Sequence, residues 1–320
     1  MAIENIQSLR EFVIKEINKI LDEKYGADSV FRRLIRSYFD KKGKKLRPLL
    51  CVSSYKLVSP DADINRVIPL AAAIEITHNA SLIIDDVFDR DIRRRGDAAF
   101  YIKHGTFAAL SVSYHLSAFV LSLTTRTKNM RVIHEMAKMG EELSFSVFLS
   151  RNLRSNHVIS KDLSMKILKL KTASLFRAAT ITGAILASGT EDEINRMEKF
   201  GEYYGIAYQL RDDALAILND ESKIGKGGDS DITNRLQTLI FLEAIELANP
   251  SEKEILKQYY LKNAEYDVEL IRDILISSGA VEKVLDIARD YINKAKEQIE
   301  IFPDSYAKKN IEELMKYIKV

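Results

Sequence analysis

The chain has 320 residues, of which 46% are hydrophobic and only 13 are Gly and 5 are Pro, so it can build a substantial core and should contain no long linkers or disorder. It carries 48 Lys and Arg against 46 Asp and Glu, a formal charge of 48 − 46 = +2. Positive charge gathers only locally, around Lys41 to Arg47 and Arg93 to Arg95. This suits a small anion and argues against nucleic acid, which needs an extended basic face.

The single cysteine and the N-terminal sequence indicate the cellular compartment of the protein. Cys51 excludes an intrachain disulfide and a Cys-only zinc cluster, and it suits a reducing compartment. The N-terminus has no apolar core of the signal-peptide type. No stretch approaches the roughly 18 uncharged apolar residues of a spanning helix. We therefore expect a cytoplasmic protein that does not span a membrane.

Apolar residues recur at helical spacing along nearly the whole chain. Over residues 3–24 they form a one-sided stripe that Gly26 would end. Pro48 is expected to open a helix running to about Val58, and Pro69 lies in the first turn of a longer apolar helix over residues 67–90. Further helices are predicted over residues 105–123, 129–150, 162–187, 192–219, 232–248, 252–262, 266–299 and 306–319.

This pattern predicts the fold class. Strand patterns are scarce, and no β-hairpin signature is visible. Several of the expected helices are apolar on most faces, as in the centre of a large bundle. The sequence therefore predicts an all-α protein with a single domain over residues 1–320, built as one large helical bundle.

Three aspartates close the apolar helix expected over residues 67–90. Asp85 and Asp89 are four residues apart and would share one helix face, with Asp86 about 100° round the axis. Like charges at this spacing destabilise a helix, so a bound cation explains them well, and Mg²⁺ prefers carboxylates combined with substrate phosphates. A solvated helix end is the alternative, but the apolar run at residues 80–84 argues against it.

A second acidic motif resembles the first but is not equal to it. Asp212 and Asp213 repeat the opening of the first motif, whereas Ala216 stands where a third carboxylate would complete it. Both motifs lie at the ends of long apolar stretches, where clustered carboxylates are costly unless something positive neutralises them.

Cations accompany the first motif. Arg93, Arg94 and Arg95 follow it at once, and guanidinium groups clamp phosphate oxygens through paired hydrogen bonds. An intrahelical salt bridge between Asp91 and Arg95 is the alternative, but it does not explain the crowding of charge beneath an apolar helix. Carboxylates for metal beside arginines for phosphate indicate a metal–diphosphate site.

Further candidate anion contacts are spread along the chain. Lys44 and Arg47 precede a helix N-terminus, although a solvated basic turn is the simpler explanation for this run alone. His78 shares a face with Asp85 and could reach the same anion, or it could be an ordinary core histidine. The pair Lys171-Thr172 lies in an apolar helix, where a lysine needs a partner that phosphate would supply.

At this point the chain resembles a known family, the trans-isoprenyl diphosphate synthases or polyprenyl synthetases, and among them the geranylgeranyl diphosphate synthases. The matching motifs occur in family order and spacing from about residue 40 to 240. They are GKKLRP at 43–48, HNASL at 78–82, DDVFD at 85–89 followed by RRG at 94–96, KT at 171–172, YQLRDD at 208–213, and Gly225-Lys226 with Asp231 downstream.

The resemblance implies an isoprenoid synthase fold, with a central apolar cavity and the two acidic motifs facing each other across its mouth. It also implies three Mg²⁺ ions, with Asp85, Asp89 and Asp212 as metal ligands and Asp86 in support. The implied contacts to the allylic diphosphate are Arg94, Lys171, Gln209 and Lys226, those to isopentenyl diphosphate are Lys44, Arg47, His78 and Arg95, and Thr172 would lie at the reacting carbons.

The implied reaction condenses isopentenyl diphosphate with an allylic diphosphate by ionisation, condensation and elimination. Product length would depend on the depth of the cavity below the first motif. Ala80 and Ser81 are small, so an early aromatic floor is lacking, and Phe119 or Phe145 could close the pocket instead. A C20 product, geranylgeranyl diphosphate, is expected.

Several residues depart from the family pattern, at Ile84, Ser113, Tyr114, Glu141, Ala216 and Leu236. Leu236 stands where the family has a lysine that contacts the allylic diphosphate, and the neighbouring Arg235 could replace it. A non-catalytic or low-activity partner subunit and a class I terpene synthase are therefore alternatives, although a cyclase would not need Lys44, Arg47 and His78. A homodimer is expected from the resemblance, with a heteromer containing a paralogue possible.

Overall fold

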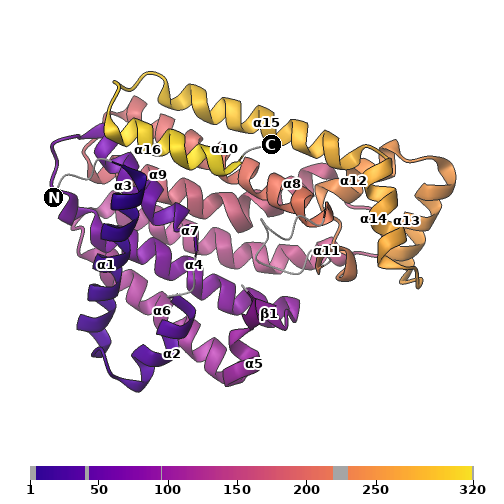
Figure 1. The fold of residues 1–320 in the computed structure, drawn as a ribbon, viewed down its shortest axis with the longest axis horizontal. Coiled ribbons are helices and arrows are strands. Elements are labelled where there is room, and N and C mark those ends of the chain that lie inside the picture. Colours follow the sequence, from indigo (N-terminus) through magenta and orange to yellow (C-terminus); the bar gives the residue numbers. More distant parts are fainter. Residues whose placement is uncertain (1–4, 40–42, 95, 219–229, 319–320) are drawn as a thin grey trace.

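The computed structural model describes residues 5–39, 43–94, 96–218 and 230–318. The predicted all-α fold class is confirmed, because the described chain is almost entirely helical (Figure 1). The helices of its first half are α1 (Ile6–Tyr25), α2 (Val30–Phe39), α3 (Leu46–Val58), α4 (Ile68–Asp89), α5 (Phe100–His104), α6 (Thr106–Thr125), α7 (Met130–Ser150), α8 (Lys161–Leu168) and α9 (Ser174–Leu186).

The second half continues in the same manner. Its helices are α10 (Glu191–Ile217), α11 (Ser230–Thr233), α12 (Leu239–Leu247), α13 (Pro250–Lys262), α14 (Val268–Ser277), α15 (Ala280–Ile299) and α16 (Tyr306–Met315). Short 3₁₀ turns occur at η1 (Ile64–Arg66), η2 (Arg151–Arg154) and η4 (Lys316–Ile318), and η3 (Lys169–Ala173) is π-helical.

Most expected helices are present, but some boundaries differ for physical reasons. Gly26 ends α1 with φ 76°, as predicted. The helix expected over residues 266–299 is broken at Gly279, whose φ of 79° lies in the left-handed region that glycine adopts readily. The helix expected over residues 232–248 begins only at Leu239.

One prediction was wrong in kind. A small antiparallel hairpin pairs β1 (Arg93–Arg94) with β2 (Asp97–Ala98), although no alternating apolar pattern predicts strands there. Gly96, with φ 76°, lies in the turn between them. The hairpin follows α4 directly, so it carries the basic segment back past the end of the first acidic motif.

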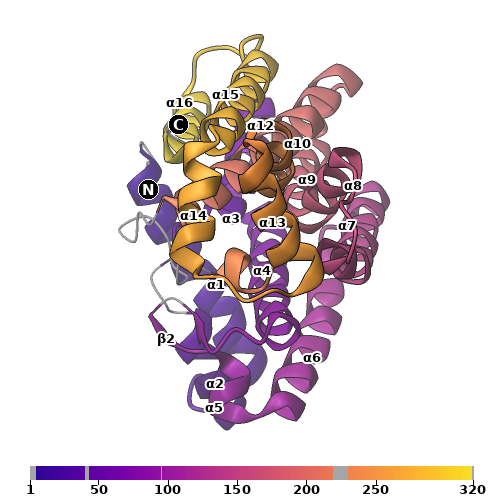
Figure 2. The same cartoon turned by 90° about the vertical axis from the view of Figure 1, so that its right-hand side faces the viewer.

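The helices pack around two adjoining apolar cores. The larger core takes side chains from α1, α3, α4, α6, α9 and the first half of α10. The second is built by the remainder of α10 with α12, α13, α14 and α15. In Figure 1, α15 and α16 run along one long side, α5 and α6 lie on the opposite side, and α13 and α14 form one end, which Figure 2 shows facing the viewer.

Two helices are more apolar than expected. Ile64–Asp89, which includes α4, and Thr106–Thr125, which is α6, are both long and apolar enough to cross a membrane by length and composition. The expectation that no stretch approaches this limit is therefore wrong for them. The first window is 67% buried within the bundle, as in the core helix of a globular protein, whereas the α6 window is only 33% buried.

Helices α9 and α10 approach each other closely at Gly201. A Cβ at Gly201 would lie 2.7 Å from both the Arg177 Cα and the Phe176 carbonyl oxygen, so the two backbones leave no room for a side chain. Gly201→Ala should lower the free energy of unfolding by about 1–3 kcal/mol, measured by urea denaturation.

Gly140 on α7 is the matched control, because nothing lies within 4 Å of a Cβ there. Gly140→Ala should leave stability unchanged or raise it by up to about 1 kcal/mol, since alanine is the better helix former. Equal effects of the two substitutions would contradict the proposed close approach of α9 and α10.

Candidate functional site

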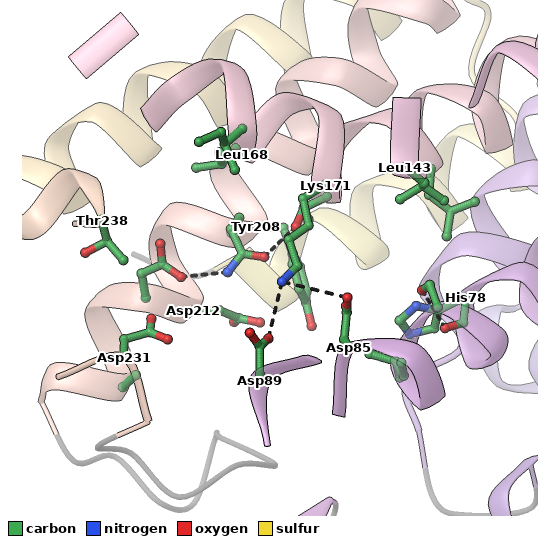
Figure 3. Close-up of a pocket in the computed structure, with 18 of the residues that line it drawn as sticks. His78, Asp85, Asp89, Leu143, Leu168, Lys171, Tyr208, Asp212, Asp231 and Thr238 are labelled. Atoms are coloured by element: carbon green, nitrogen blue, oxygen red, sulfur yellow. Dashed lines mark hydrogen bonds and ion pairs between the residues drawn. The ribbon is translucent and has the colours of Figure 1, made fainter. Parts of the chain in front are cut away.

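A cavity of about 510 Å³ opens between α4, the η3–α9 segment and α10. Aspartates line it from opposite sides: Asp85 and Asp89 come from the end of α4, and Asp212 and Asp213 come from α10. Asp231 of α11 adds a further carboxylate. Figure 3 shows Asp85 and Asp89 on one side and Asp212 and Asp231 on the other, with Lys171 reaching the two aspartates of α4.

Lys171 joins the two aspartates of the first motif. Its Nζ lies 3.9 Å from Asp85 Oδ1 and 3.5 Å from Asp89 Oδ2 (Figure 3). The charge of Asp85 is the largest cause of a raised pKa for Lys171, so the ammonium form persists there despite its burial. Asp85 and Asp89 therefore lie on one face of α4, as their spacing predicts, and both carboxylates approach the Lys171 ammonium.

Asp86 faces the other way. It is fully buried and accepts a hydrogen bond of 2.7 Å from Arg94 Nε, with a second contact from Arg94 Nη2. Arg94 also lies 3.4 Å from Asp91 and lines the cavity. Asp86 therefore supports the site from behind by holding Arg94, while Asp85 and Asp89 face the cavity.

A π-helical segment sets the position of Lys171. Both Lys171 and Thr172 lie in η3, and π-helical turns inside α-helices frequently occur at functional sites. The Thr172 hydroxyl donates a hydrogen bond of 2.7 Å to Gln209 Oε1, and Gln209 Nε2 donates one of 2.6 Å to Asp213 Oδ1. This chain of contacts ties η3 to the second acidic motif.

Desolvation acts on both aspartates of the second motif. Burial raises the pKa of Asp212, and burial together with the charge of Asp231 raises that of Asp213 well above its usual range. Arg211 Nη1 donates a hydrogen bond of 3.0 Å to Asp212 Oδ1, which opposes the effect of burial. Ala216 also lines the cavity, so the missing carboxylate would have faced it.

A second set of cations lines the same cavity from α3 and α4. Arg47 Nη1 lies 3.3 Å from His78 Nε2, and the guanidinium stacks 4.1 Å from the centre of the Phe176 ring. Its buried Nε has no hydrogen-bond partner among the described residues, and burial lowers its pKa. Lys44 is half-buried nearby, whereas Lys45 is held by Glu75 at 2.8 Å. An anion would satisfy the buried guanidinium.

Not every predicted site residue is among those that the structure describes. Arg95 and Lys226 lie outside the described residues. Among those described, no three or more His, Cys, Asp or Glu side chains form a preassembled metal cluster. The candidate metal donors are carboxylates, which suit Mg²⁺, and they stand on α4, α10 and α11.

Two sequence predictions are corrected here. Neither Phe119 nor Phe145 lines the cavity: Phe119 packs on Tyr25, and Phe145 is 49% exposed on the outer face of α7. The apolar lining comes instead from leucine and isoleucine, chiefly Leu143, Ile167, Leu168 and Leu175.

Arg235 does not replace the cation missing at Leu236. Its guanidinium donates to Asn263 Oδ1 at 2.9 Å and stacks 4.5 Å from the centre of the Tyr259 ring, whereas Leu236 lines the cavity. Sequence reasoning also missed Arg154, whose Nη2 lies 3.2 Å from Asp89 Oδ1, because the residue carries no motif and is far from Asp89 in the chain.

Residues 28–275 match the sequence pattern described as polyprenyl synthetase. The chain belongs to the polyprenyl synthetase family. The resemblance seen in its motifs is thereby confirmed. The family is one of prenyltransferases, and trans-prenyl diphosphate synthesis is its class of reaction.

Individual relatives cover most of the chain. A short chain isoprenyl diphosphate synthase of Methanothermobacter thermautotrophicus is 30% identical over 270 residues, 83% of this chain and 82% of the relative. A geranylgeranyl diphosphate synthase of Saccharolobus solfataricus is 30% identical over 299 residues, covering 88% and 86%. The products named for matched relatives extend to octaprenyl diphosphate, so they do not decide a chain length for this polyprenyl synthetase.

A solved structure confirms the fold. The polyprenyl synthase from Caulobacter crescentus CB15, crystallised with calcium and isoprenyl diphosphate, is 29% identical. It superposes with a TM-score of 0.90, covering 99% of this chain and 97% of that one. The polyprenyl synthetase described here has the all-α isoprenoid synthase fold.

The position of Lys171 predicts competition with metal. Replacing it by the uncharged Lys171→Met should raise the affinity for Mg²⁺ measured by calorimetry without any diphosphate, because a cation beside Asp85 and Asp89 is removed. The effect should be up to about fivefold, since partly exposed ion pairs contribute at most about 1 kcal/mol.

Lys169→Met in the same π-helical segment is the control, since Lys169 pairs at 3.0 Å with Glu202, which does not line the cavity. It should leave Mg²⁺ affinity unchanged. Unchanged or weaker binding by Lys171→Met would show that the two aspartates do not attract the metal.

Proposed function

We propose that this polyprenyl synthetase condenses isopentenyl diphosphate with an allylic diphosphate, in a Mg²⁺-dependent reaction, to make geranylgeranyl diphosphate. The observation that carries the proposal is that one cavity is lined by two pairs of cations, Lys44 with Arg47 and Arg94 with Lys171, and by the carboxylates of both acidic motifs. A second set of cations suits a second diphosphate, which a terpene cyclase would not need.

We assign the metal to carboxylates of both motifs. Asp85, Asp89 and Asp212 are the proposed ligands of three Mg²⁺ ions, and Asp86 positions Arg94. Once bound, the metal would stabilise the negative charge that develops on the departing pyrophosphate. Calcium in the Caulobacter crescentus structure supports a divalent ion in this type of fold.

The two diphosphates are assigned to the two sets of cations. Arg94, Lys171 and Gln209 would hold the allylic diphosphate, joined by Lys226 outside the described residues, and Thr172 would lie at the reacting carbons. Lys44, Arg47 and His78 would hold isopentenyl diphosphate, with Arg95 outside the described residues. The unsatisfied Nε of Arg47 supports the second assignment, because a buried guanidinium without a partner is costly.

The apolar lining serves the chemistry. Leu143, Ile167 and Leu175 line the cavity, so water is excluded from the allylic cation that ionisation would form. The side chain of Lys171 can exchange its carboxylate contacts for the departing pyrophosphate. We assign proton removal to this pyrophosphate, so no protein side chain is required as a strong base.

We also propose that the chain is a single domain, because α10 contributes Tyr204 to one core and Ile206 to the other. A homodimer is favoured by an apolar face on α6 and α7. There Phe107 is 86% exposed, Tyr114 is 82% exposed and Phe148 is 62% exposed, and a second copy would cover them. A cytoplasmic location is proposed from the single cysteine, Cys51.

The product assay separates the candidate functions. The purified protein alone is incubated with Mg²⁺, labelled isopentenyl diphosphate and C5, C10 or C15 allylic diphosphates, and the products are sized. Longer prenyl diphosphates support the synthase. Activity only with an added paralogue would support a partner subunit in a heteromer, and cyclic hydrocarbon would support a terpene synthase.

Asp85→Ala should lower turnover at least about a hundredfold, because it removes a ligand of the charge-stabilising metal. Asp273→Ala, an exposed aspartate on α14 outside the cavity, is the control and should leave turnover unchanged. Full activity of Asp85→Ala would remove the metal assignment.

Ser81→Phe should shorten the main product from C20 to C15. Ser81 lines the cavity one helical turn before Asp85, so an aromatic ring there would block the space in which the chain grows. Ser81→Ala is the control and should preserve product length. An unchanged product from Ser81→Phe would show that the chain grows elsewhere.

A further inference from the structure

Position 236 adds no charge to the described lining of the cavity, whereas the family resemblance predicts a lysine there. Leu236 lines the cavity, and its neighbour Arg235 points away to Asn263 and Tyr259. If the allylic diphosphate binds beside Lys171, a further cation at the mouth of the cavity would strengthen its binding.

Arg154 lies at the rim of the cavity. It ends η2, between α7 and α8, and its Nη2 lies 3.2 Å from Asp89 Oδ1, while Lys171 Nζ approaches the other oxygen of the same carboxylate at 3.5 Å. The preceding residue, Leu153, lines the cavity itself. Arg154 is therefore a cation at the mouth, flanking Asp89 opposite Lys171.

The loop that carries Arg154 is fixed to the segment that contains Leu236. Gln237 is fully buried, and its backbone N–H donates to the Leu153 carbonyl at 2.8 Å. Its Nε2 donates to the carbonyls of Ser155 at 2.8 Å and His157 at 3.0 Å, and its Oε1 accepts from the Ile159 N–H at 3.0 Å. Four hydrogen bonds made by Gln237 thus hold the backbone on both sides of Arg154 against the segment that contains Leu236.

The contact of Arg154 with Asp89 is easily exchanged. The side chains are 38% and 19% exposed, and ion pairs with this access to water are weak. A guanidinium binds phosphate oxygens through two parallel hydrogen bonds, which are stronger and more directional. The geometry favours a guanidinium that leaves Asp89 when a diphosphate enters.

We propose that Arg154 binds the allylic diphosphate and supplies the cation that position 236 lacks. This inference rests on the proposed function, because it concerns the substrate of the same cavity. It assigns substrate contact to the connection between α7 and α8.

Equilibrium binding tests the inference without turnover. The chain contains no Trp, so calorimetry is preferred to intrinsic tryptophan fluorescence. Each variant is titrated with farnesyl thiolodiphosphate, an unreactive allylic analogue, in the presence of Mg²⁺. Arg154→Ala should weaken binding about tenfold or more, because a hydrogen-bonded charge pair is lost. The affinity for isopentenyl diphosphate should be unchanged.

Two further variants make the test specific. Arg151→Ala removes an exposed arginine from the same turn and should leave analogue binding unchanged. The double variant Arg154→Ala with Leu236→Lys should recover most of the lost affinity. Mg²⁺ affinity measured without analogue should not fall in Arg154→Ala, since the removed cation competes with the metal.

The outcomes separate this inference from the proposed function. Analogue binding by Arg154→Ala equal to wild type would overturn the inference, even if the wild type makes prenyl chains. A loss that Leu236→Lys does not repair, or one that Arg151→Ala shares, would also overturn it. A wild type that binds the analogue through Arg154 but makes no prenyl chain would instead refute the proposed function.

Discussion

The rest of the site depends on one constraint, the repulsion among aspartates that α4, α10 and α11 place around a single cavity inside an apolar bundle. Such charges are tolerated only where cations lie close by. Lys171 stands between Asp85 and Asp89, and Arg211 holds Asp212. These contacts are partial and partly exposed, so they stabilise the folded protein while leaving the carboxylates available to a metal with its diphosphate.

Satisfying this constraint requires unusual backbone geometry. Lys171 reaches the aspartates from a π-helical segment, which widens one helical turn and changes the direction of the residues that follow it. The segment is held closely, since a Cβ at Gly205 of α10 would lie only 2.6 Å from the Ala173 Cα. The Thr172–Gln209–Asp213 contacts then connect this wall to the second motif. The π-helical segment η3 therefore both positions Lys171 and supports the second acidic motif.

The sequence predicts correctly those features of the fold and the site that depend on helical periodicity. The common face of Asp85 and Asp89 follows from their spacing. The break near Gly279 is also encoded locally, because glycine readily adopts the positive φ found there. Positions that depend on the rotation of one helix against another were not accessible, which is why Phe119 and Phe145 were wrongly expected in the cavity. Arg154 was missed for the same reason, because only the Gln237 contacts bring its loop to the mouth.

The two departures from the family resemblance at positions 216 and 236 leave uncharged side chains in the site. Ala216 stands where the resemblance predicts a carboxylate, and Leu236 stands where it predicts a lysine. Both residues line the same cavity. The carboxylates of both motifs nevertheless line this cavity together with Lys171, and Arg154 lies 3.2 Å from Asp89 at its mouth. This arrangement supports our proposal that the site handles a metal and a diphosphate.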